Sequence, residues 1–227
     1  MEVLRSKVYA AWSAVTARPV VAPLLIAFVV RAATALVIST TAGFVFPDES
    51  QYVTLGRLAA SGHLTSSYVV NGQTGRSLFR EAASFMWPLT ALFRAFGPHI
   101  LVAALWAAVF GAVTAAIVSL LVARALAPQW GALAGTVVGL WPSQVLWSSV
   151  VLRESMVWAG LAAAALGVAL LARATAATSV VVAAVILVVA LVTLAYLRDW
   201  VFLPAAWSAA ISVWMFRPAR PVPVRVG

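Results

Sequence analysis

Three pairs of adjacent charged residues carry the chemistry available to this chain: Asp48-Glu49, Arg153-Glu154 and Arg198-Asp199. A carboxylate beside an acceptor hydroxyl can act as a general base. The fork of donors on an arginine suits it to hold a phosphate and to stabilise the charge that develops on it. Any single pair is most simply a structural ion pair at a helix end. Their recurrence, in a chain with only six acidic residues, favours one shared site that transfers a group from a lipid phosphate.

The composition is that of an integral membrane protein. Hydrophobic residues make up 64% of the chain, charged residues 9%, and the mean hydropathy is +1.03. The net charge of +9 is not gathered into a basic cluster with interleaved aromatics, which argues against nucleic-acid binding. The chain has no cysteine, which excludes disulfides, thiol catalysis and cysteine-bound metal.

We expect an all-α membrane protein with a single transmembrane domain over residues 20–216. It lies between a basic leader, 1–19, and a basic tail, 217–227. The leader resembles a signal peptide, but the apolar run that follows is long enough to remain as an uncleaved first span. Six spans are predicted, the third interrupted at Trp141-Pro142: 20–44, 98–123, 130–149, 154–172, 178–197 and 200–216.

The one long polar segment, 45–97, is predicted to be an extracytoplasmic loop with interfacial helices. Pro47 would stop the first span, and Asp48 would cap an amphipathic helix that ends at Gly62. The second apolar stretch, Leu78 to Gly97, is too short and too charged to span easily. These helices would hold the acidic pair at the membrane surface.

The distribution of charge predicts the orientation of the chain. With six spans, eight lysines and arginines fall on the side of the two termini and six on the other side. The positive-inside rule then places both termini in the cytoplasm. Every carboxylate except Glu2 would face the extracytoplasmic side of the plasma (inner) membrane.

Arg31 and the two histidines are the remaining polar residues of interest. Arg31 lies in the middle of the first span, where a charge costs roughly 2.5–3.5 kcal/mol, so a functional or buried-pair role is favoured over snorkelling. His63 and His99 are isolated, and no metal site is predicted from them.

Aromatic residues near the loop 45–97 can either anchor and pack the helices or line the expected site. Most tryptophans lie near span ends, as in an aromatic belt, while Trp87 lies on the side of the expected site. Tyr52 either faces that site or packs on Leu55. We keep both as candidates to line the site.

The acidic motif resembles one found in the GT-C superfamily, which includes protein O-mannosyltransferases and lipid A aminoarabinose transferases. In that superfamily a D-E-x-x-Y motif opens the first extracytoplasmic loop, and here it reads Asp48-Glu49-Ser50-Gln51-Tyr52. The proline-containing element from Trp87-Pro88 to Gly97 and the segment from Pro142 to Glu154 resemble later family elements. The resemblance covers about residues 20–200.

The resemblance implies a cell-envelope glycosyltransferase that takes a sugar from a polyprenyl phosphate, with no cofactor and without excluding a divalent metal. Asp48 would be the base, Glu49 an orienting group, and Glu154 the completion of the acidic site. Family members usually carry more spans and an acceptor-binding C-terminal domain, so a protein partner would supply that region. The residues implied to bind the donor phosphate are Arg31, Arg80, Arg153 and Arg198. Those implied to line the site or contact the acceptor are Tyr52, His63, Trp87 and Asp199.

Two other functions remain open from the sequence. A non-catalytic subunit or scaffold could have the same fold and act with a partner. A small transporter would need polar residues along its spans, yet only Arg31 is charged within a span core. The transporter therefore ranks last.

Overall fold

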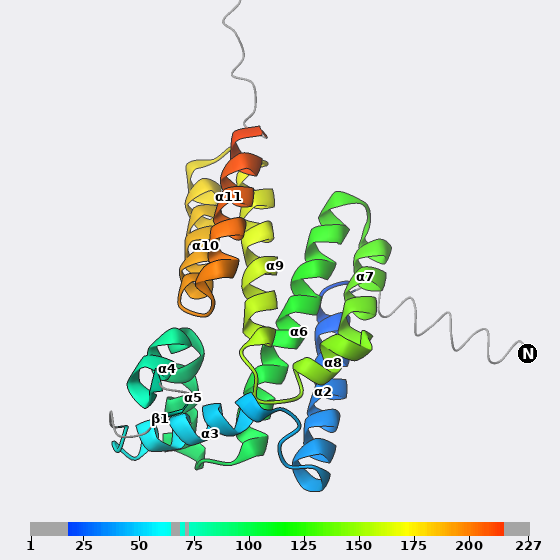
Figure 1. Cartoon of the computed structure of the whole chain (residues 1–227). Coiled ribbons are helices and arrows are strands. Elements are labelled where there is room, and N and C mark those ends of the chain that lie inside the picture. The colour runs from blue at the N-terminus through cyan, green and yellow to red at the C-terminus, as the bar shows by residue number, and fades with distance from the viewer. Residues whose placement is uncertain (1–17, 65–68, 71–72, 216–227) are drawn as a thin grey trace, which may run out of the picture.

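The structure, a computed structural model, describes residues 18–64, 69–70 and 73–215. Most of the expected leader, 1–19, and the whole tail, 217–227, lie outside these residues. The described chain is a set of helices joined by short connections (Figure 1). The exception is one antiparallel hairpin of two-residue strands, β1 (Val69–Val70) and β2 (Gln73–Thr74).

Four helices among the described residues are long and apolar enough to cross a membrane: α2 (Val21–Thr41), α6 (Ile100–Ala125), α9 (Glu154–Leu171) and α10 (Ala177–Ala195). At 1.5 Å per residue the shortest of them is about 27 Å long, close to the thickness of the hydrocarbon core. Each coincides with a predicted span. These helices identify the chain as a membrane protein.

The other two predicted spans have different forms. The third is broken at Trp141 into α7 (Pro128–Leu140) and α8 (Pro142–Trp147). The break falls where the sequence predicted it, because a proline disfavours helical backbone at the residue before it. The sixth is α11 (Asp199–Met215), which has 17 residues and contains Pro204.

The long helices form two packed groups (Figure 1). Helices α2, α6 and α7 pack together, α9 packs with α10 and α11, and contacts between α6 and α9 join the groups. Small residues let the backbones approach closely. A Cβ added at Gly131 would lie 2.5 Å from the Ser119 carbonyl oxygen on α6, so α7 could not pack as it does with a larger residue there.

A compact module of three helices lies below α9 and α10 and beside the lower part of α6 in Figure 1: α3 (Pro47–Ala60), α4 (Gly75–Glu81) and α5 (Ala83–Phe96). Its buried side chains share one core with α6, α9 and α10. The module therefore sits firmly on the bundle at the start of α9. The main large side chains of that core are Leu55, Phe79, Phe85, Met86, Leu89, Phe93, Leu194 and Leu197.

The start of α3 differs from the prediction. Helix α2 already ends at Thr41, so Pro47 does not stop it, and Phe46 rather than Asp48 is the N-cap residue. Pro47 occupies the first turn, where its missing N–H costs nothing. The Glu49 side chain accepts from the Phe46 N–H instead, which is the reciprocal half of a capping box. The predicted end is confirmed, since Gly62 follows α3 with φ +77°.

Candidate functional site

An ion pair between Glu154 and Arg198 forms the centre of the candidate site. Glu154 begins α9, and Arg198 lies at the corner between α10 and α11. Their side chains are 19% and 24% exposed, so a bound molecule can reach the pair. The second carboxylate oxygen of Glu154, Oε2, is buried and has no hydrogen-bond partner in the described structure.

Arg153 ties this pair to the module below. One of its terminal nitrogens donates to the Leu197 carbonyl at 2.9 Å and to the Glu81 carbonyl, at the end of α4, at 3.3 Å. Its Nε is buried and has no acceptor among the described residues. Arg153 thus ties the start of α9 to the end of α4 and to Leu197, which follows α10.

Tyr52 brings the acidic helix α3 to the same place. Its ring packs edge-on against Phe85, with 5.5 Å between centroids. Burial raises the pKa of Tyr52 to about 12. The charge of Arg153 lowers this pKa and the charge of Glu154 raises it. Asp48 raises the pKa and Arg198 lowers it, both by smaller amounts. A charge from each of the three pairs therefore influences the pKa of Tyr52.

We expect this environment to be visible in a spectrophotometric titration of tyrosinate. The unfolded chain would ionise Tyr52 near pH 10, and the folded chain near pH 12. Because the folded pKa is the higher one, the contribution to stability is complete below pH 10 and is lost as the pH rises toward 12. The difference between the wild-type and Tyr52→Phe titrations should show one tyrosine ionising near pH 12, and ionisation near pH 10 would contradict this packing.

The adjacent acids Asp48 and Glu49 have different surroundings. Glu49 is 1% exposed, and its Oε1 accepts from the backbone N–H groups of Val45 and Phe46, both at 2.8 Å. Its Oε2 accepts from the N–H of Val151 at 3.1 Å. Both oxygens are therefore engaged by backbone donors, and Glu49 ties α3 to the segment that leads into α9. Asp48 is exposed and is the member of the pair that a substrate can reach.

Arg31 holds the break between α7 and α8. The Arg31 side chain is fully buried. One of its terminal nitrogens donates to the Gly139 carbonyl at 2.5 Å and to the Ala27 carbonyl at 3.1 Å. Its Nε donates to the Ser148 hydroxyl at 2.6 Å. Gly139 is in the last turn of α7, where carbonyls lack helical partners and carry partial negative charge. These contacts join α2 to the helix break and include no other predicted site residue. The structure thus gives Arg31 a structural role at the helix break, and its other terminal nitrogen is buried without a hydrogen-bond partner among the described residues.

Four other predicted residues are exposed and are not joined to the ion pair by any contact in the described structure: Arg80, His63, Trp87 and Asp199. His63 interacts with the Ser61 hydroxyl, and Trp87 packs edge-on against Phe79. The Asp199 carboxylate accepts from the Trp200 N–H at 2.8 Å. No group of three histidine or acidic residues suited to a metal occurs within the described ranges.

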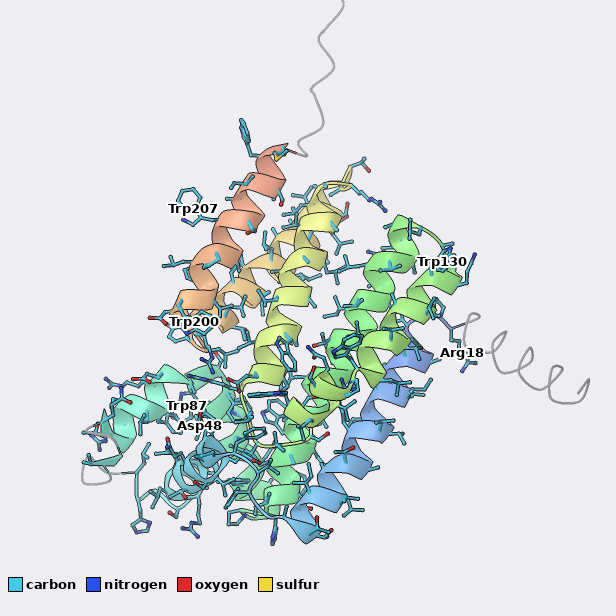
Figure 2. All side chains as sticks on the ribbon, turned by 45° about the vertical axis from the view of Figure 1, so that its right-hand side comes forward. Arg18, Asp48, Trp87, Trp130, Trp200 and Trp207 are labelled. Carbon is cyan, nitrogen blue, oxygen red and sulfur yellow. The ribbon has the colours of Figure 1, made fainter. Side chains whose placement is uncertain are left out.

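An apolar groove between α9 and α11 leads away from the ion pair, and sequence reasoning missed it. Its volume is about 770 Å³. The Arg198 guanidinium lies 5.3 Å from the ring centroid of Trp200, which lines the groove. Figure 2 shows Trp200 at the lower end of α11, above the module that carries Asp48 and Trp87. The available signal was the alanine-rich face of α9, made of Ala164, Ala165, Ala169 and Ala172.

Comparison of the chain with protein-family models, with curated proteins and with solved structures finds no match. The functional argument therefore rests on the residues of this chain. They provide an arginine–carboxylate centre, a reachable acid on α3 and an apolar groove that begins beside them.

Proposed function

We propose that the chain is a membrane glycosyltransferase that moves a sugar from a polyprenyl-phosphate donor to an acceptor hydroxyl. The observation that carries the proposal is the position of the Glu154–Arg198 pair at the end of the apolar groove. A lipid phosphate needs both features, since its head requires cationic donors and its chain requires apolar cover.

The groove supports a long-chain donor. It extends along α11 from Trp200 to Ser212, a rise of about 18 Å at 1.5 Å per residue. Its wall is almost entirely apolar. A polyprenyl chain laid in it would place the phosphate beside Arg198, whose side chain is 24% exposed, at the end opposite to Arg173.

The proposed reaction uses Asp48 as the base. The acceptor oxygen attacks the anomeric carbon, the bond between that carbon and the phosphate oxygen breaks, and the acceptor proton passes to Asp48. Polyprenyl phosphate leaves with the bonding electron pair, and Arg153 and Arg198 stabilise its charge. Glu154 holds Arg198 in place through their ion pair.

The proposed site faces the extracytoplasmic side. In this arrangement α7 with α8 and α11 complete six passes, and both termini are cytoplasmic. The module of α3, α4 and α5 lies at the membrane surface. The bias of lysine and arginine toward the opposite end of the bundle supports this orientation. A protein partner that contributes to acceptor binding is compatible with the exposed surface of the module.

The test is transfer of a labelled sugar from polyprenyl phosphates in membranes that contain the wild-type chain or Asp48→Asn. Loss of a positioned base should lower the rate by about 100-fold or more, with protein level unchanged because Asp48 is exposed. Glu81→Gln removes another exposed carboxylate of the same module and should transfer normally. Normal sugar transfer by Asp48→Asn would refute the assignment of Asp48 as the general base. If the wild-type chain transferred no sugar from several donors, the result would favour a non-catalytic subunit or scaffold.

A further inference from the structure

Two arginines meet at the opposite end of the bundle from the ion pair. Arg124 is in the last turn of α6, and Arg173 follows the end of α9. One terminal nitrogen of Arg173 donates to the backbone carbonyl of Arg124 at 3.0 Å. Both side chains are exposed, and no carboxylate of the described residues forms an ion pair with either. The contact holds the Arg173 guanidinium at the end of α6, next to the backbone of Arg124.

An apolar pocket opens directly beneath these arginines. It has a volume of about 280 Å³ and lies between the last turns of α6 and α9, which Figure 1 shows at the same end of the molecule. We call it the α6–α9 pocket. It is lined by Leu121, Val122, Arg124, Ala125, Leu166, Ala169, Leu170 and Arg173. Among the described residues, the two arginines are the charged groups that line it, so it combines a cationic rim with an apolar interior.

We propose that the α6–α9 pocket binds an anionic glycerophospholipid. The phosphate lies between Arg124 and Arg173, and one acyl chain enters the pocket along Leu166 and Leu170. Basic pockets between membrane helices bind anionic lipid headgroups in this way. Guanidinium groups favour phosphate oxygens through charge-assisted hydrogen bonds.

The charge at this rim selects the occupant. A zwitterionic lipid carries its own cation, which two adjacent arginines would repel. A soluble phosphate could meet the arginines but would leave the apolar pocket uncovered. Ala169 and Arg173 line both this pocket and the groove between α9 and α11, whereas Arg124, Ala125 and Leu170 line the pocket and not the groove. The proposal does not depend on the proposed function, because lipid retention is measured without sugar transfer.

The experiment is native mass spectrometry of the full chain released from nanodiscs that hold equal amounts of phosphatidylglycerol and phosphatidylcholine with identical chains. We expect wild type to retain phosphatidylglycerol preferentially. Arg124→Gln and Arg173→Gln should each lower that preference about fivefold. Arg18→Gln and Arg57→Gln each remove one exposed positive charge that does not line the pocket, and they should preserve the preference.

Two further arms test the two halves of the site. Ala125→Trp keeps both arginines but fills the pocket, and it should also reduce lipid retention, whereas Arg124→Lys keeps the charge and should retain most of the preference. The proposal would be overturned if wild type retained both lipids equally, or if the arginine variants retained phosphatidylglycerol as wild type does. Either result would mean that the lipid is bound only as part of the surrounding bilayer. Displacement of the lipid by inorganic phosphate would overturn it in favour of a soluble-anion site.

Discussion

Replacing Glu49 with alanine is expected to destabilise the folded chain by on the order of 3 kcal/mol or more. The change leaves three backbone donors without their acceptor, the buried N–H of Val151 and the partly buried N–H groups of Val45 and Phe46. Each unsatisfied buried donor costs about 1–3 kcal/mol. The measurement is thermal or denaturant unfolding of the purified chain in detergent, followed by tryptophan fluorescence.

The neighbouring residue supplies a matched control. Asp48→Ala removes a carboxylate one position away that is exposed, so its stability should stay within about 0.5 kcal/mol of wild type. Glu49→Gln should be intermediate, because the amide keeps one acceptor oxygen and turns two N–H donors toward the backbone donors. If Glu49→Ala unfolded like wild type but lost sugar transfer, Glu49 would be a reacting group and not a structural one.

The second large effect is expected at the Glu154–Arg198 pair, where the same substitutions should change stability and sugar transfer in different ways. Glu154→Gln or Arg198→Gln alone leaves one partly buried charge without its partner and should lower stability. The double variant removes both charges and should recover most of that loss. Sugar transfer should fall about 100-fold or more in all three variants, because the phosphate loses the aligned arginine in each.

This double-mutant cycle distinguishes the two interpretations of the pair. The measurements are unfolding in detergent and labelled-sugar transfer in membranes, made on the same four proteins. If the double variant recovered sugar transfer together with stability, the pair would stabilise the fold and take no part in the reaction. Arg198→Lys provides a graded control, since it keeps the charge but not the fork of donors.

The sequence alone determined the class of protein, the positions of most helices and the residues of the three charged pairs. Hydrophobic runs such as 98–123 are long enough that only a membrane helix satisfies their backbone. Trp141-Pro142 marked the break because proline acts on its immediate neighbours. These features depend on composition and local chemistry, so they can be read without knowing which segments meet.

Only the tertiary structure decided what each charged residue contacts. Asp48 and Glu49 are adjacent in sequence, yet one is exposed and the other is buried against Val151, 102 positions away in the chain. Arg31 likewise finds its acceptors at the end of α7. Backbone carbonyls and N–H groups occur at every residue, so no side-chain pattern could identify these partners in advance.

The groove and the α6–α9 pocket were also decided by packing. Each lies between two helices, and the space between two helices depends on the crossing angles and on the side chains at their contact. Alanines such as Ala164 and Ala169 line space in one place, while others such as Ala107 are buried in contact with neighbours. The sequence supplied the charges at the ends of these spaces, and the packing of α6, α9 and α11 determined that an apolar space lies beside each of them.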